Sequence, residues 1–337
     1  MADTNALQKL LFQKIKEQLR PHQSLVDEVS DILNITPDGV YRRIRGETPL
    51  RLNEAATLCN QFQISLDELH QQSNGEAIVF HPSGLSEANL DFESYLKNLL
   101  GLLTYIQGRG VTRSLYAAKD IPVFHLFQFP ELALFKMFFW QKTIFNSPKL
   151  AGVQFEPRIQ SDKEERCIQL CNQIAEKYAL IPTTEIWNEE TSVSFLKQIA
   201  YYYEAGLFKS REDAMFLTDL VEKYFNHLQK EAELGYKFLA SNPPQNRVQN
   251  YTLYYNDLIL IDNIINLTYE NGSQTFLIYH SIEYLSTTHQ GFCEQVSDWL
   301  VTLTKTSDLI SAVSQRQRNR FFIKVYDRIE KLKAQLR

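Results

Sequence analysis

The sequence has little of what marks a secreted, membrane-spanning or generally polyanion-binding protein. Only four of its 337 residues are cysteine, which is too few for a disulfide framework in a chain of this length. It contains no run of about 18 apolar residues, the length that a transmembrane helix needs. Its first residues lack the basic and apolar stretches of a signal peptide, and the net charge of −5 argues against general binding to polyanions. We therefore expect a cytoplasmic protein without membrane contact.

Motifs for familiar catalytic and cofactor chemistry are also missing. No glycine-rich phosphate loop occurs. Cys167 and Cys171 share a helical face, but no histidine pair accompanies them at a zinc-binding spacing. We expect no catalytic residues, no metal and no cofactor, and we rank an enzyme below a binding protein.

Composition and length predict two or three folded domains. The chain is 44% hydrophobic and 22% charged, as in ordinary globular proteins. We assign residues 1–72 to a first domain, and residues 73–88, with their glycine, serine and proline, to a linker. Residues 89–337 form a large second region with a candidate sub-boundary near 241–250.

The most informative segment, residues 25–46, has the pattern of two short helices joined by a tight turn. Asn34 occupies the turn, where a left-handed backbone conformation is tolerated. Thr36 can cap the second helix, and Pro37 fits its first position. Gly46 then closes that helix.

Three further helices complete the predicted domain. Apolar spacing predicts helices at about 5–19 and 52–62. Ser65, with Glu68 three residues later, forms a capping box for a short fifth helix. Five short helices in this length predict one compact domain.

Residues 7–70 resemble the lambda-repressor-like, or Xre/Cro-type, helix-turn-helix domain. The features that carry the resemblance are Asn34-Ile35-Thr36 at the turn, the inward pair Val40 and Ile44, Gly46, and the segment from Ile64 to Leu69. The sequence departs from the family at Val26, where a DNA-contacting Gln is frequent, at Asn34, usually Gly, and at Ile44, often Glu. The resemblance implies a five-helix domain that binds double-stranded DNA.

The second helix of the motif carries the predicted DNA contacts. Such a helix lies in the major groove, where its N-terminal and outward side chains reach base edges. Arg42 is the candidate base reader because arginine can grip guanine O6 and N7 together. Arg43, Arg45 and Arg51 are expected on phosphates, Tyr41 on the sugar-phosphate backbone, and Gly39 at a close approach of that backbone. The full predicted set is Thr36, Asp38, Gly39, Tyr41, Arg42, Arg43, Arg45 and Arg51. The alternative is a small helical domain whose arginines only solvate one face.

The proposed DNA-binding domain is not basic overall. Residues 1–72 contain eight Lys or Arg and ten Asp or Glu. The acids Asp27, Glu28 and Asp31 lie on the first helix of the motif, whereas the arginines cluster on the second. Because each domain should bind DNA weakly, we expect a homodimer.

An unusually aromatic segment, residues 111–145, begins the larger region. It could line an apolar ligand pocket with Lys119, Asp120 and His125 as the polar groups. Aromatic residues at helical spacing are more often core, and we favour that interpretation.

Beyond residue 88 the periodicity predicts a mainly α fold with a small antiparallel sheet. Helices are predicted at about 89–106, 162–179, 189–204, 210–235, 289–303 and 314–335. Strands are predicted at 251–255, 258–261, 264–269 and 275–279. Glu270-Asn-Gly-Ser273 is a hairpin turn signal.

These patterns together favour a sequence-specific transcription regulator of the Xre type. Residues 1–72 would bind DNA, and the remainder would form the dimer and sense a small-molecule or peptide effector. The alternative is a protein-interaction or phage-defence scaffold in which the helix-turn-helix only tethers the protein to DNA.

Overall fold

The computed structural model describes residues 4–19, 23–66, 69, 78–83, 91–241, 248–257, 262–279 and 282–337. The chain divides into two compact units, residues 1–80 and 81–337. The division falls within segment 73–88, which is the linker predicted from the sequence. Each unit is described by itself.

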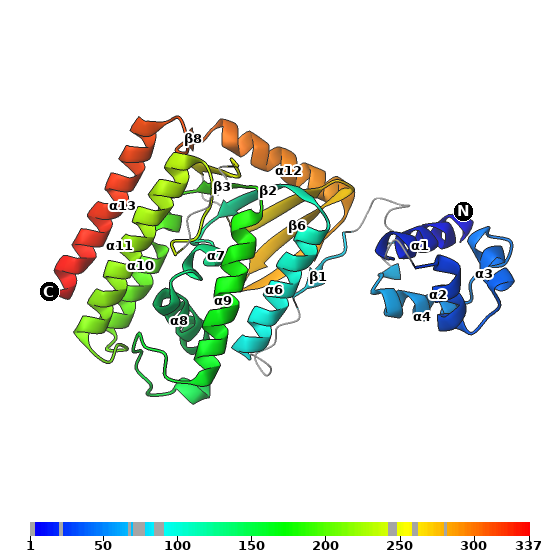
Figure 1. Ribbon diagram of the computed structural model, residues 1–337, viewed down its shortest axis with the longest axis horizontal. Coiled ribbons are helices and arrows are strands. Elements are labelled where there is room, and N and C mark those ends of the chain that lie inside the picture. Colours follow the sequence, from blue (N-terminus) through cyan, green and yellow to red (C-terminus); the bar gives the residue numbers. More distant parts are fainter. Residues whose placement is uncertain are drawn as a thin grey trace. The chain divides into compact units, whose positions relative to one another are not determined.

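The N-terminal unit is a cluster of short helices around a small apolar core (Figure 1). Its described helices are α1 (Thr4–Gln18), α2 (Leu25–Leu33), α3 (Pro37–Ile44) and α4 (Leu52–Phe62). Ile15, Val29, Val40 and Leu58 are completely buried at the centre, as their helical spacing predicts. The predicted fifth helix, with its capping box at Ser65 and Glu68, extends outside the described residues.

The C-terminal unit is built on one mixed sheet of eight strands in the order β1-β7-β6-β5-β2-β3-β4-β8. Its strands are β1 (His81–Pro82), β2 (Val111–Ala118), β3 (Thr183–Trp187), β4 (Tyr251–Tyr255), β5 (Ile264–Tyr269), β6 (Gly272–Tyr279), β7 (Glu283–Thr287) and β8 (Asp308–Leu309). Strands β2, β3 and β4 pair in parallel, whereas the remaining neighbours are antiparallel.

This sheet corrects the prediction of a small antiparallel sheet confined to residues 250–280. The segments 251–255 and 264–279 are strands as predicted, and β5 and β6 form the hairpin predicted at Glu270–Ser273. However, β4 pairs in parallel with β3 rather than with β5. Strands 68 residues or more away in the sequence supply the parallel partners, so no local hairpin signal could reveal them. The predicted strand at 258–261 lies outside the described residues.

The C-terminal unit remains mainly helical. Its helices are α6 (Phe92–Gly108), α7 (Val123–Leu126), α8 (Pro130–Phe139), the π-helix η2 (Trp140–Ile144), the 3₁₀ turn η3 (Pro148–Leu150), α9 (Asp162–Leu180), α10 (Glu189–Glu204), α11 (Arg211–Leu234), α12 (Gln290–Lys305) and α13 (Gln315–Leu336). The six long helices predicted from periodicity are all present, with ends shifted by at most a few residues. Figure 1 shows α10, α11 and α13 side by side at one end of the unit.

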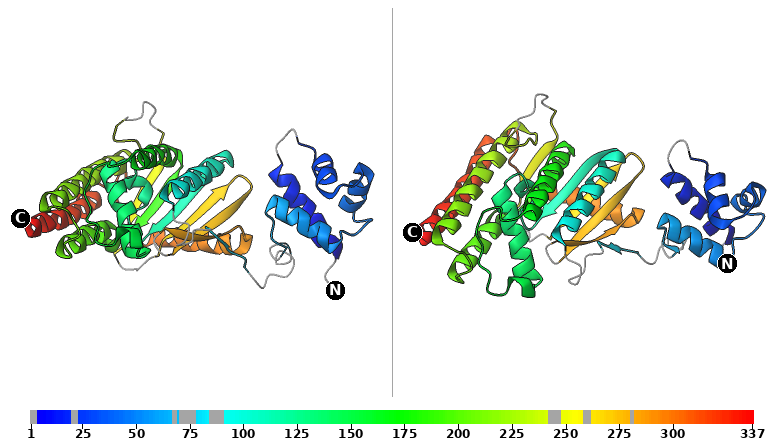
Figure 2. Two further views of the ribbon diagram at one scale, coloured as in Figure 1. Left: turned by 90° about the horizontal axis from the view of Figure 1, so that it is seen from below. Right: turned by 60° about the horizontal axis from the view of Figure 1, so that its bottom comes forward.

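Helices cover both faces of the sheet, so its central strands are buried on both sides. Figure 2 shows α12 on the face opposite α6 and α9. Tyr116 and Ala118 of β2 belong to the main core with the helices of the larger layer. Leu115 and Ala117, pointing the other way, pack in a smaller core with Leu300 of α12. Alternation along the strand therefore directs every second side chain toward the larger helical layer.

Candidate functional site

The turn between α2 and α3 has the backbone that its residues predict. Asn34 ends α2 in the left-handed conformation, with φ 52° and ψ 50°. The Thr36 hydroxyl caps α3 by accepting a 3.3 Å hydrogen bond from the Gly39 amide. Gly46 follows α3 with φ 76°, which glycine adopts without strain. These local interactions fix the direction in which α3 leaves the turn.

One side of α3 presents polar side chains to solvent. Thr36, Asp38 and Tyr41 are exposed, and the side chains of Arg42 and Arg45 are each 55% exposed. Both arginines lie near Glu47, with Arg45 Nε 2.7 Å and Arg42 Nε 3.8 Å from its carboxylate. Exposed ion pairs of this kind are weak, so both guanidinium groups remain available to an external anion. Arg51, at the start of α4, is also exposed.

Arg43 differs from the outward orientation expected from the sequence. Its side chain is only 13% exposed. The guanidinium donates to Glu54 of α4 at 3.2 and 2.8 Å and to the Gly39 carbonyl at 3.1 Å. Glu54 also accepts from the Arg51 amide at 2.9 Å. Arg43 therefore holds α3 against the start of α4, and Gly39 is half-buried beside it.

Gln8 of α1 fixes the other end of α3. Its amide donates to the carbonyls of Arg43 and Thr48 at 2.6 and 2.9 Å, and its side-chain oxygen accepts from the Leu50 amide at 2.8 Å. The side chain is buried. The exposed residues of α3 thus lie on a helix whose C-terminal end is held by hydrogen bonds to α1. Specific recognition needs side chains that are supported in this way.

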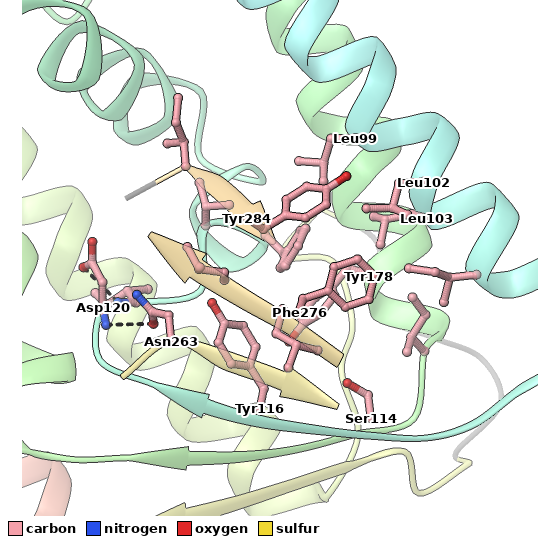
Figure 3. Close-up of a pocket in the computed structure, with 18 of the residues that line it drawn as sticks. Leu99, Leu102, Leu103, Ser114, Tyr116, Asp120, Tyr178, Asn263, Phe276 and Tyr284 are labelled. Atoms are coloured by element: carbon pink, nitrogen blue, oxygen red, sulfur yellow. Dashed lines mark hydrogen bonds between the residues drawn. The ribbon is translucent and has the colours of Figure 1, made fainter. Parts of the chain in front are cut away.

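The C-terminal unit contains a cavity of about 110 Å³ between the sheet and α6. Figure 3 shows leucines of α6 on one side and aromatic side chains of the strands on the other. Tyr116 extends from β2 and Tyr284 from β7 into this space. The apolar part of its wall includes Leu99, Leu102, Leu103, Ile265, Leu267 and Phe276.

A buried ion pair lies at one end of the cavity wall. Lys136 Nζ is 2.7 Å from Asp120 Oδ2, and the lysine side chain is 2% exposed whereas that of Asp120 is 26% exposed. Ser194 donates to the other Asp120 oxygen, and Lys136 also donates to Gln198 at 3.2 Å. Burial opposes ionisation of Asp120, but the Lys136 charge outweighs it and keeps the pKa of Asp120 below its ordinary value.

Lys119, Asp120 and His125, the three polar residues considered for a pocket in segment 111–145, do not lie in one site. Asp120 lines the cavity, together with Phe124 and Trp140. Lys119 is exposed and pairs with Asp262, and His125 belongs to a different buried cluster. Most aromatic residues of the segment are core, as favoured from the sequence, but the segment also supplies one wall of the cavity.

The buried cluster around Glu185 was not anticipated from the sequence. One carboxylate oxygen contacts His125 Nε2 at 2.9 Å and accepts from the Tyr178 hydroxyl. The other accepts from Trp187 Nε1 at 2.9 Å and from the Tyr251 hydroxyl at 3.0 Å. Both oxygens are thus paired. The signal available in the sequence was the alternation Thr183, Glu185, Trp187, which places the carboxylate on an inward face of β3.

Charges around Glu185 compensate one another. Burial disfavours the Glu185 carboxylate, but the neighbouring His125 charge and hydrogen bonds lower its pKa overall. Burial likewise disfavours protonated His125, yet Glu185 and then Glu231 raise the pKa of its imidazole. Lys237, which donates to the Tyr178 carbonyl and the Thr183 hydroxyl at 2.7 Å each, has a pKa lowered to about 7, chiefly by burial. The cluster joins β3, β4, α7, α9 and α11 in the interior.

The described ranges contain neither a cluster of metal ligands nor a membrane-spanning helix. Nowhere in these ranges do three or more His, Cys, Asp or Glu side chains gather in a way that could hold a metal ion. Of the helices in the described part of the chain, none is long and apolar enough to cross a membrane.

Comparison with known proteins adds no assignment. No family model matches the chain, and neither a curated protein nor a solved structure matches it.

Proposed function

We propose that the chain is a sequence-specific DNA-binding transcription regulator of the cytoplasm. The observation that carries the proposal is the capped α2–α3 turn followed by a helix with Tyr41, Arg42 and Arg45 exposed on it. A single helix fits the major groove, and arginine is the commonest reader of guanine there. The rigid attachment of α3 through Gln8 and Arg43 supports this use, because a flexible helix could not hold a register on DNA.

The proposed roles of the arginines differ in one respect from those expected from the sequence. Arg42 reads a base, and Arg45 and Arg51 bind phosphates. Arg43 is a positioning residue, because its guanidinium is already engaged by Glu54. Thr36 and Asp38, exposed at the N-terminal end of α3, face the groove, and Tyr41 packs on the backbone of the DNA.

Dimerisation follows from the charge of the N-terminal unit. Asp27, Glu28 and Asp31 on α2 repel phosphate and offset the arginines of α3. One copy should therefore bind weakly, and two copies on half-sites about 34–36 Å apart would bind tightly. We assign the pairing to the C-terminal unit. Sedimentation analysis showing a monomer both free and on DNA would contradict this part of the proposal.

Selection of bound duplexes from a random pool tests the DNA-binding proposal. We expect the full chain to enrich a two-fold symmetric sequence, and fluorescence anisotropy to show saturable binding to it. Arg42→Ala should weaken that binding roughly 5- to 150-fold for each half-site, since a bidentate base contact is worth about 1–3 kcal/mol.

Arg158→Ala is the matched control for this measurement. Arg158 is exposed in the C-terminal unit and, like Arg42, lies near a glutamate, at 3.4 Å from Glu156. The substitution Arg158→Ala removes one positive charge, as Arg42→Ala does, but leaves α3 unaltered. DNA binding should therefore stay unchanged. Equal effects of the two substitutions, or no enriched sequence at all, would overturn the proposal.

A further inference from the structure

We propose that the cavity between the sheet and α6 binds an uncharged, largely apolar small molecule of about one ring that carries a hydrogen-bond acceptor such as a carbonyl oxygen. The cavity of about 110 Å³ is of the order of the engineered apolar cavity of about 150 Å³ that takes up benzene. Its wall is mainly apolar, with leucines from α6 facing Phe276 and the neighbouring strand residues (Figure 3).

Polar atoms without partners indicate what the ligand must offer. Within the part of the chain that the structure describes, no hydrogen-bond partner is found for the hydroxyls of the buried Tyr95 and Tyr116 or of the half-buried Tyr284. The indole N–H of Trp140 is fully buried and also lacks a partner among the described residues. All four side chains line the cavity. Because buried polar groups are nearly always paired in folded proteins, such a concentration in one wall marks a place for a hydrogen-bonding ligand.

All of these groups can donate a hydrogen bond, although a phenol oxygen can also accept one. An indole N–H can only donate. Burial raises the pKa of Tyr95 and Tyr116 well above the ordinary value of 10.0, so both phenols keep their protons at neutral pH. In Figure 3 the ring of Tyr116 extends from β2 into the cavity, with its hydroxyl on the side of Asn263. Tyr116 is the residue we assign to the ligand's acceptor atom.

The charge of the cavity selects for a neutral ligand. The cationic Lys136 in its wall is already neutralised by Asp120 at 2.7 Å. A charged ligand would enter this apolar space without a counter-ion, and burial of an unpaired charge is strongly unfavourable. A neutral ketone satisfies both the apolar wall and the donors.

Fluorine NMR with three ligands of one shape tests the inference on the full chain without DNA. The probes are 4-fluoroacetophenone, fluorobenzene, which lacks the acceptor, and 4-fluorobenzoate, which carries a charge. We expect saturable binding of the ketone, about 3- to 10-fold weaker binding of fluorobenzene for one lost hydrogen bond, and the weakest binding for the benzoate.

Two substitutions locate the binding. Tyr116→Phe removes only the hydroxyl and should reduce ketone binding to the level of fluorobenzene, whereas Tyr201→Phe, on the exposed surface of α10, should change nothing. Leu103→Phe places a larger side chain in the cavity wall, which fills part of the space and should reduce binding of both neutral probes. The exposed Leu180→Phe is its control.

Absence of saturable binding of any probe, or binding that survives both Tyr116→Phe and Leu103→Phe, would overturn the inference. A ligand in this cavity could act as the effector of a DNA-binding regulator, and that role rests on the proposed function. Because the probe titration contains no DNA, failure of the cavity proposal and failure of the DNA-binding proposal appear in separate measurements.

Discussion

The guanidinium of Arg43 and the carboxylate of Glu54 form two parallel hydrogen bonds, at 3.2 and 2.8 Å, between the recognition-helix candidate α3 and α4. Both side chains are largely buried. Two-point arginine–carboxylate pairs fix direction as well as distance. The pair therefore sets how α3 is presented, although neither residue reaches beyond the surface of the unit.

Arg43→Ala should loosen α3 and α4 because it leaves the Glu54 carboxylate without its main partner. We expect protection against hydrogen exchange in both helices to fall about tenfold or more, corresponding to roughly 1.5–3 kcal/mol. Arg45→Ala, which removes an exposed partner of Glu47, should change protection little. Equal losses in the two variants would show that Arg43 has no special structural role.

The same pair predicts a pH dependence. Burial opposes ionisation of Glu54, but the hydrogen bonds and charge of Arg43 lower the pKa of Glu54 below its ordinary value of 4.5. A lowered carboxyl pKa contributes stability that is complete above the unfolded value and is lost as the pH falls through the folded one. The difference in exchange protection between the wild type and Glu54→Gln should thus be full at pH 6–7 and should shrink below about pH 4.5. A difference independent of pH would contradict this assignment.

Lys237 predicts a pH dependence of the same sign, but at higher pH, in the C-terminal unit. Its folded pKa of about 7 lies below the ordinary 10.5 because the amine is buried. Between these values the unfolded chain binds more protons than the folded one, so stability rises with pH. From pH 7 to 9 the wild type should gain up to about 1.4 kcal/mol per pH unit relative to Lys237→Met.

Urea unfolding followed by tryptophan fluorescence measures this difference. All three tryptophans, Trp140, Trp187 and Trp299, lie in the C-terminal unit, so the signal reports that unit alone. Titration of the buried tyrosines above pH 9 changes the free energy of unfolding of both proteins equally. This contribution therefore cancels in the difference between them. Parallel pH profiles for wild type and variant would show that Lys237 is not neutral in the folded protein.

The ion pair in the cavity wall can be tested in the same assay. Asp120→Asn leaves the buried Lys136 charge without a counter-ion and should cost about 3 kcal/mol, at the low end for broken buried pairs because Asp120 is partly exposed. Asp262→Asn, which breaks the exposed pair with Lys119 at 3.1 Å, should cost less than about 1 kcal/mol. Adding Lys136→Met to Asp120→Asn should restore much of the loss. A double variant no more stable than the single one would contradict the pairing.

Local signals in the sequence were enough to predict α1 to α4 and the six longest helices of the C-terminal unit, but not α7 and α8 in the aromatic segment. The α2–α3 turn depends on Asn34, Thr36 and Pro37, all within four residues, and the structure has the backbone that they predict. The long helices α9, α10 and α11 carry their apolar spacing and caps within themselves. In each case the residues that determine the element are also its neighbours in the chain.

The sheet and the buried sites depend on partners far apart in the sequence. Strand β2 is buried on both faces, so it lacks the alternation of a half-exposed strand. Glu185 meets His125 and Tyr251 across 60 and 66 residues. Arg43 likewise appeared exposed in the helical pattern, because only the position of Glu54 turns it inward. Such contacts follow from tertiary packing, which periodicity within one segment does not encode.

The most direct test of the central claim is the base preference of α3. Duplex selection with the wild type and with Arg42→Ala, at the same salt concentration, compares the two preferences position by position. We predict that the wild type selects guanine at one position in each half-site, that Arg42→Ala loses the preference there, and that the remaining positions are unchanged. Identical preferences in the two proteins, or no preference in the wild type, would contradict the claim that α3 reads DNA through Arg42.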